Sequence, residues 1–101
     1  MIGDKLRITE NERNIIKNTI KEKINNSEIY LFGSRIDDNK KGGDIDLLVV
    51  TDEKVSLETK LEILAKLEIN GINRKIDLIL KTPETEEQNI IKTALEEGKL
   101  L

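Results

Sequence analysis

Apolar residues recur every four positions in the first third of the chain, which is the spacing of one face of a helix. Thr9 and Glu12 have the spacing of a capping box, so they predict the start of this helix. Asn25-Asn26 predicts its end, and the helix is expected over residues 10–25. Its buried stripe is predicted to consist of Ile15, Ile16, Ile20 and Ile24.

Three short apolar runs predict strands at residues 28–33, 44–51 and 74–80. The second run is apolar on both faces in its second half, which favours a central strand covered on both sides. The connection over residues 34–43 is too short for a helical crossover, so the first two strands are expected to be antiparallel. A helix between the second and third strands allows those two to be parallel.

That intervening helix is predicted to begin at Ser56 and to end at Asn70-Gly71. A last helix is expected to begin near Thr82-Pro83, with Thr85 and Gln88 as a second possible capping box, and to end at Gly98. The inward residues are expected to be Leu57, Leu61, Leu64 and Leu67 in the first of these helices, and Ile90, Ile91, Ala94 and Leu95 in the second.

The order of these elements predicts one α/β domain over residues 1–101, in which helices pack on a small mixed β-sheet of three or more strands. A length of 101 residues suits a single small domain. No apolar run reaches the ~20 residues that a membrane helix needs, and residues 1–12 lack the apolar core of a signal peptide. We therefore expect a cytoplasmic protein that has no contact with a membrane.

Composition narrows the possible chemistry. The chain has no histidine and no cysteine, which excludes a Ser-His-Asp triad, a histidine- or thiolate-bound zinc and a disulfide framework. A net charge of -3 and an aromatic content of 2% argue against a nucleic-acid-binding surface. Catalysis or metal binding must therefore use carboxylates and hydroxyls, which suits Mg²⁺ or Mn²⁺.

Acidic residues open two of the predicted strands. Asp44 and Asp46 point to one face of their strand, roughly 6.6 Å apart along it, and Leu48 continues this face into the core. Asp77 begins the next strand in the same way. If these strands are neighbours, three carboxylates converge at one end of the sheet, which suits two divalent ions about 3.5–4 Å apart.

Gly33-Ser34 ends the first strand next to this expected cluster. Glycine lets backbone approach a phosphate closely, and Ser34 can donate a hydroxyl and cap a short helix over residues 35–39. The glycine-lysine pattern of a Walker A loop is absent. Each feature alone has a simpler explanation. Gly-Ser often forms a plain turn, and paired aspartates often lie at a solvated strand start. Asp77 can pair with Lys75 or Arg74. Their order on three successive strands favours a nucleotide site.

The stretch FGSRIDDNKKGGDIDLLV and the later KIDLIL resemble the nucleotidyltransferase superfamily that includes DNA polymerase beta. Within it the chain is most similar to the minimal nucleotidyltransferases, or MNT proteins, and the resemblance spans residues 28–80. It implies transfer of a nucleoside monophosphate from an NTP to a hydroxyl. By position, Asp44 and Asp46 would bind both Mg²⁺ ions, while Asp77 would bind the catalytic ion and help to deprotonate the acceptor.

The resemblance also implies that Gly33 and Ser34 hold the triphosphate and that Arg35 contacts a phosphate, although Arg35 can equally be a surface charge. MNT proteins are often paired with a helical HEPN toxin, as its antitoxin. The main prediction is therefore transfer of AMP from ATP to a tyrosine of a HEPN partner, within a hetero-oligomer. Two alternatives stay open: a non-catalytic module that blocks the partner by occlusion, and a regulatory domain that senses NTP.

Overall fold

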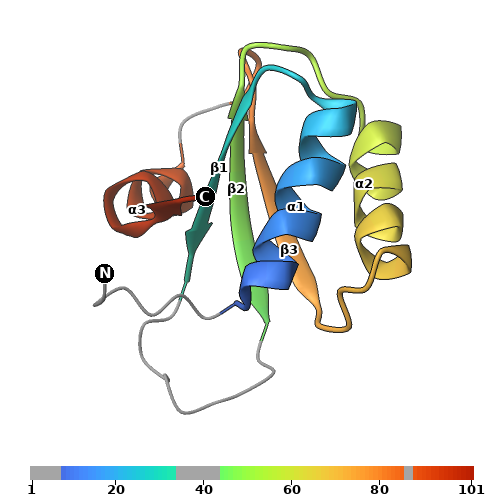
Figure 1. Cartoon of the computed structure of the whole chain (residues 1–101). Helices are drawn as coiled ribbons and strands as arrows, with labels where there is room; N and C mark the ends of the chain where they lie inside the picture. The colour runs from blue at the N-terminus through green and yellow to red at the C-terminus, as the bar shows by residue number, and fades with distance from the viewer. Residues whose placement is uncertain (1–7, 34–43, 86–87) are drawn as a thin grey trace.

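The computed structural model describes residues 8–33, 44–85 and 88–101. The arrangement of the helices and strands is shown in Figure 1. The elements are α1 (Glu10–Lys23), β1 (Ser27–Phe32), β2 (Ile45–Thr51), α2 (Leu57–Ile69), β3 (Ile76–Lys81), α3 (Asn89–Glu97) and β4 (Lys99–Leu100).

The strands form one mixed sheet in the order β3-β2-β1-β4. β1 and β2 are antiparallel, whereas β2 and β3 are parallel, so both expected pairings are confirmed. β2 is an inner strand of the sheet, as its apolar second half predicted. The pattern did not predict β4, whose two residues are too few to show an alternation and which pairs with Tyr30 and Leu31 of β1.

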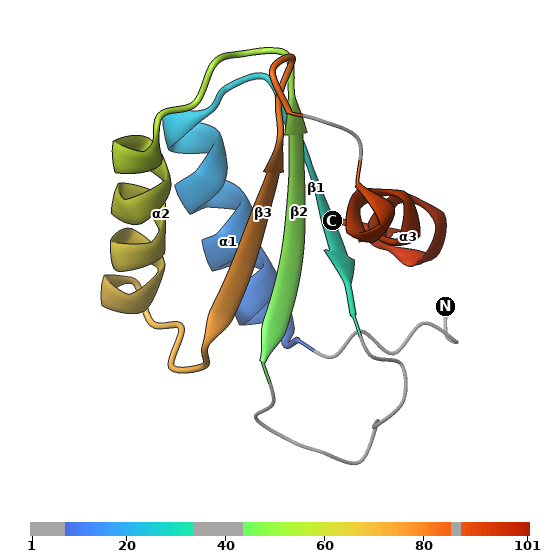
Figure 2. The same ribbon diagram turned by 180° about the vertical axis from the view of Figure 1, so that it is seen from behind.

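The two faces of the sheet carry cores of different size. α1 and α2 cover one face, while α3 lies on the other (Figures 1 and 2). Ile45, Leu47 and Val49 of β2 point into the larger core. Of the predicted stripe, Ile16, Ile20 and Ile24 are buried there, while Ile15 is partly buried and packs against this core. The smaller core consists of Leu48, Ile91 and Ala94, against which Tyr30, Phe32, Val50 and Ile79 pack.

The capping box of α1 is confirmed, because the Thr9 amide donates to Glu12 Oε1 over 2.9 Å and the Glu12 amide donates to Thr9 Oγ1 over 3.0 Å. The second box is wrong. α3 begins only at Asn89, and its N-cap Gln88 makes no side-chain capping bond. Thr85 instead closes a turn with Thr82, whose amide donates to Thr85 Oγ1 over 2.9 Å, so its hydroxyl is already engaged before the helix starts.

The predicted inward stripe of α2 is only partly correct. Leu67 is buried and Leu64 packs against the core, but Leu57 and Leu61 are 69% and 56% exposed. Ile63 takes the inward position that the stripe gave to Leu61. Apolar residues surround α2, so periodicity alone cannot tell which side faces the sheet. In α3, Ile91 and Ala94 are buried as predicted, while Ile90 and Leu95 are largely exposed.

One ion pair ties the start of α1 to the segment that enters β3. Arg74 Nη1 lies 3.0 Å from Glu12 Oε1, and the two side chains are only 14% and 17% exposed. Arg74→Met leaves this carboxylate without its cation, so we expect the free energy of unfolding to fall by about 2–3 kcal/mol in urea denaturation. Lys54→Met is the control, because its pair with Glu84 is exposed and its loss should cost under about 0.5 kcal/mol. Equal losses in the two variants would contradict the prediction.

Candidate active site

Two neighbouring strands, β2 and β3, bring the predicted acidic residues to one end of the sheet. Asp46 of β2 is in register with Asp77 of β3 on one side and with Phe32 of β1 on the other. Register partners on neighbouring strands place their side chains on the same face, and the strands are about 4.8 Å apart. A bond from the Ile45 amide to the Lys75 carbonyl, 2.9 Å long, holds β2 and β3 together where both begin. The structure thus confirms that Asp46 and Asp77 are neighbours.

The acidic residues lie on the face of the sheet that α3 covers only in part. Along β2, Asp46 precedes Leu48 on this face, at the margin of the smaller core, and Asp46 is half-buried. Asp44 and Asp77 are exposed. Asp44 directly precedes β2, two residues before Asp46. An incoming molecule can therefore reach this end of the sheet from solvent, while the apolar part of the same face holds the strands in place.

Gly33 is the point of closest approach between β1 and the acidic residues. Its φ of +113° is a backbone conformation that residues with side chains rarely adopt. A Cβ built on it would lie 2.2 Å from Asp46 Oδ2, well inside contact distance. Glycine is therefore required at this position for two reasons. The backbone has a positive φ, and there is no space for a Cβ beside Asp46. The backbone of Gly33 therefore lies directly against the carboxylate of Asp46.

Ser34 and Arg35, the other predicted phosphate contacts, lie outside the described residues, as does the helix expected over residues 35–39. The sequence suggested Gly33 for its approach to a phosphate, but it offered no sign that Gly33 touches Asp46. That contact depends on the register of β1 with β2, which no local pattern specifies.

All the candidate ligands are carboxylate oxygens, the donors that Mg²⁺ prefers. Among the residues that the structure describes, no three acidic side chains are grouped closely enough to hold a metal ion by themselves. Mg²⁺ sites of phosphate-handling enzymes commonly use one or two carboxylates together with substrate phosphates and water. The Asp46–Asp77 pair beside Gly33 fits a site of that kind. Metal binding by Asp44, Asp46 and Asp77 stays a prediction.

Tyr30 is the only tyrosine of the chain and lies on the same face as Asp46. It is half-buried in β1, and its hydroxyl donates to Glu28 Oε1 over 3.3 Å. Desolvation raises the pKa of Tyr30 above its usual 10, and the charge of Glu28 raises it further. This hydroxyl is therefore harder to deprotonate than a free phenol.

The family described as "Polymerase beta, Nucleotidyltransferase" matches residues 14–101, which is most of the chain. The chain belongs to the polymerase beta nucleotidyltransferase family. The mixed sheet with its helices agrees with this fold, and the predicted class of enzyme, a nucleotidyltransferase, is confirmed. No curated protein matches the sequence.

Solved structures place the chain near MNT antitoxins. It shares 25% identity and a TM-score of 0.65 with the complex described as tri-AMPylated Shewanella oneidensis HEPN toxin with MNT antitoxin, covering 89% of this chain and 67% of that one. A toxin–antitoxin structure with AMP-PNP has a TM-score of 0.71 at 21% identity, with coverage of 91% and 72%. Another Shewanella oneidensis structure has a TM-score of 0.71 at 17% identity, with coverage of 93% and 71%.

The family match confirms the predicted polymerase beta nucleotidyltransferase family, and the solved structures of similar fold include an MNT antitoxin. In the part of the chain that the structure describes, no helix has the length and apolar character needed to cross a bilayer.

Proposed function

We propose that this nucleotidyltransferase is a Mg²⁺-dependent protein adenylyltransferase of the cytoplasm, acting as antitoxin to a HEPN partner. It would move AMP from ATP to a tyrosine of that partner. The observation that carries the proposal is the in-register pair of Asp46 and Asp77 beside Gly33, at an exposed end of the sheet. The MNT antitoxin described in complex with an AMPylated HEPN toxin supports the choice of acceptor.

In this mechanism Asp44 and Asp46 would hold both Mg²⁺ ions, and Asp77 would share the one nearer the acceptor. Bound Mg²⁺ would offset phosphate charge and make the acceptor hydroxyl more acidic. Gly33, with its positive φ and no side chain, would let the backbone there approach the triphosphate closely. Asp77, which is exposed, would take the proton from the acceptor hydroxyl.

The acceptor oxygen would then bond to the α-phosphorus of ATP while the bond from that phosphorus to the bridging oxygen breaks. Pyrophosphate leaves with the electron pair of that bond. For this displacement the hydroxyl must be held in line with the leaving oxygen. The hydroxyl of Tyr30 is bonded to Glu28, which is in register with Val50 and not with Asp46, so it is directed away from the aspartates and poorly placed to serve. An acceptor carried by another protein meets the requirement.

The test is incubation of the full chain with ATP labelled at its α-phosphate, Mg²⁺ and the HEPN protein encoded beside it. We expect label on the HEPN protein, a mass increase of one or more AMP units in intact-mass spectrometry, and loss of its RNase activity. A stable complex that blocks the RNase without any change of mass would replace this proposal with occlusion. Exchangeable label that remains on the chain would indicate a sensor of NTP.

A further inference from the structure

A row of apolar side chains faces solvent along the whole of α2. Leu57, Leu61 and Ile69 are 69%, 56% and 79% exposed, and Ala65 between them is exposed as well. These four residues, here called the α2 ridge, recur every fourth position and so form one continuous ridge on the helix surface. The opposite side of α2 already contributes Ile63 and Leu67 to the core. The ridge therefore points away from the sheet.

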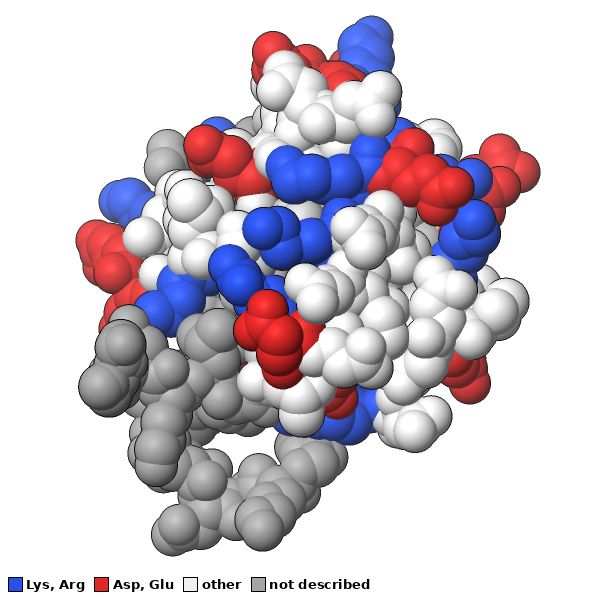
Figure 3. Space-filling view, viewed as in Figure 1, with Lys and Arg blue, Asp and Glu red and all other residues white. Residues whose placement is uncertain are grey.

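The other exposed apolar residues are arranged differently. On α3, Ile90 and Leu95 lie on either side of the buried pair Ile91 and Ala94, so they form the rim of the smaller core. Only α2 carries a second complete apolar side among the helices described. Figure 3 shows surface that is neither acidic nor basic on the side of the molecule where α2 lies. Contiguous apolar surface of this kind marks a site of protein association.

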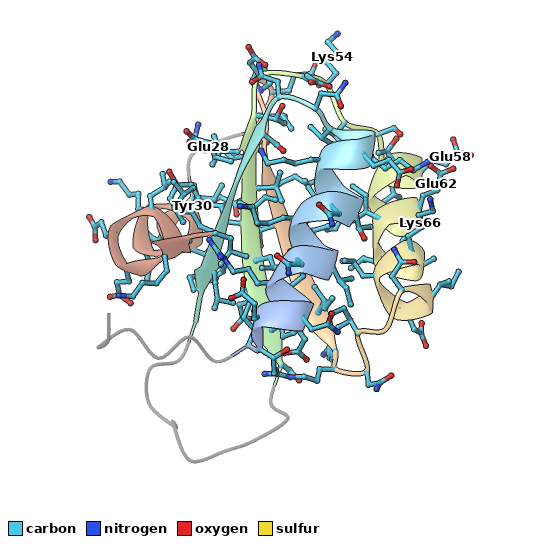
Figure 4. The ribbon with its side chains drawn as sticks, viewed as in Figure 1. Glu28, Tyr30, Lys54, Glu58, Glu62 and Lys66 are labelled. Atoms are coloured by element: carbon cyan, nitrogen blue, oxygen red, sulfur yellow. The ribbon has the colours of Figure 1, made fainter. Side chains whose placement is uncertain are left out.

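The charges beside the α2 ridge define what can cover it. Glu58, Glu62 and Glu68 are exposed and adjoin the ridge, whereas Lys60 and Lys66 lie further round the helix and are half-buried. Lys66 is paired with Glu22 of α1 over 3.4 Å, and Glu62 is paired with Lys23 of α1 over 3.3 Å. Figure 4 shows Glu58, Glu62 and Lys66 extending from the outer side of α2. The acidic border of the ridge therefore consists of Glu58 and Glu68, which are both exposed.

This border disfavours a second copy of the chain as the occupant. Packing two ridges together would bring Glu58 and Glu68 of each copy to one interface, and like charges there are repulsive. A partner helix with its own apolar ridge, bordered by lysine or arginine, would cover the apolar surface of α2 and pair with its acidic border. Two helices with ridges at four-residue spacing interlock at about −50°.

The position of the ridge relative to the acidic residues suits a partner that also supplies the acceptor. α2 lies on the face of the sheet opposite Asp46, so a helix bound there leaves the site open. The Ile69 end of α2 points toward the end of the sheet where β2 and β3 begin (Figures 1 and 2). A hollow of about 380 Å³ beside this end, lined by Leu64, Glu68 and residues 72–76, can accept a partner side chain.

We propose that the α2 ridge is the docking surface for a basic amphipathic helix of the acceptor protein. The inference rests on the proposed function in taking the HEPN protein as that acceptor. Binding along α2 would hold the partner at one side of the chain. The partner's target residue would then reach the aspartates around the β3 edge of the sheet.

The test compares two double variants of the full chain. Leu61→Gln with Ile69→Gln changes the ridge, and Ile90→Gln with Leu95→Gln is the matched control, since it also replaces two exposed apolar residues. Titration calorimetry with the HEPN protein should show affinity at least about tenfold weaker for the ridge variant and unchanged for the control. Glu58→Lys with Glu68→Lys should also weaken binding and make it less sensitive to salt.

The possible results separate this inference from the proposed function. Unchanged affinity in the ridge variant overturns the inference, even if the wild-type chain transfers AMP. Loss of affinity only in the ridge variant supports it, even if no transfer is seen. Absence of any complex between the wild-type chain and the HEPN protein overturns it. A wild-type dimer in sedimentation velocity that the ridge variant lacks would assign the surface to a second copy and overturn it too.

Discussion

Asp46→Asn is expected to reduce AMP transfer to the HEPN protein by about 100- to 1,000-fold. Asp46 is the central member of the candidate site, because it lies between Gly33 and Asp77 and is the most buried of the three aspartates. An amide in its place cannot supply the negative charge that a divalent cation needs. Single-turnover transfer, measured by intact mass, is the assay. Calorimetry with Mn²⁺ should show a matching loss of metal affinity.

Asp44→Asn is expected to behave like Asp46→Asn if both residues hold the ions, whereas Glu96→Gln on α3 serves as the control for loss of one exposed acid. The variants should keep the circular dichroism spectrum of the wild type, since neither Asp44 nor Asp46 belongs to a hydrophobic core. Full transfer and unchanged Mn²⁺ affinity in both aspartate variants would remove them from the metal site.

Gly33→Ala is expected to lower transfer by about a hundredfold, through displacement of Asp46. The new Cβ would lie 2.2 Å from Asp46 Oδ2, so either the carboxylate or the turn must move. The positive φ of 113° adds strain of about 1–3 kcal/mol, which should appear as a lower free energy of unfolding. Transfer kinetics and urea denaturation measure the two effects separately.

Gly71→Ala is a matched control for backbone strain. Its φ of +124° is similar, but the nearest contact of its Cβ would be Ile15 Cδ1 at 3.4 Å, an ordinary distance. It should lose comparable stability and keep its transfer activity. If Gly33→Ala also keeps its activity, the contact between Gly33 and Asp46 has no part in the reaction.

Most of the fold could be predicted because its signals are local. The four-residue spacing of Ile16, Ile20 and Ile24 and the capping box at Thr9 define α1 without reference to any other element. The short connection over residues 34–43 requires β1 and β2 to be antiparallel, and the helix between β2 and β3 permits their parallel pairing. From that strand order it followed that the acidic residues at the starts of β2 and β3 lie side by side.

Tertiary structure decided what no local pattern specifies. α2 is apolar on several sides, and its packing against the rest of the fold buries Ile63 and Leu67 while Leu57 and Leu61 stay exposed. A turn closed by Thr82 and Thr85 precedes α3, which begins later in the chain than predicted. β4 is a strand only because its two residues pair with β1. Likewise, Gly33 meets Asp46 through strand register alone. The sequence by itself determined which residues could form the site and the elements that carry them. Their contacts, and the side of α2 left exposed, were decided by packing, because each depends on segments far apart in the chain.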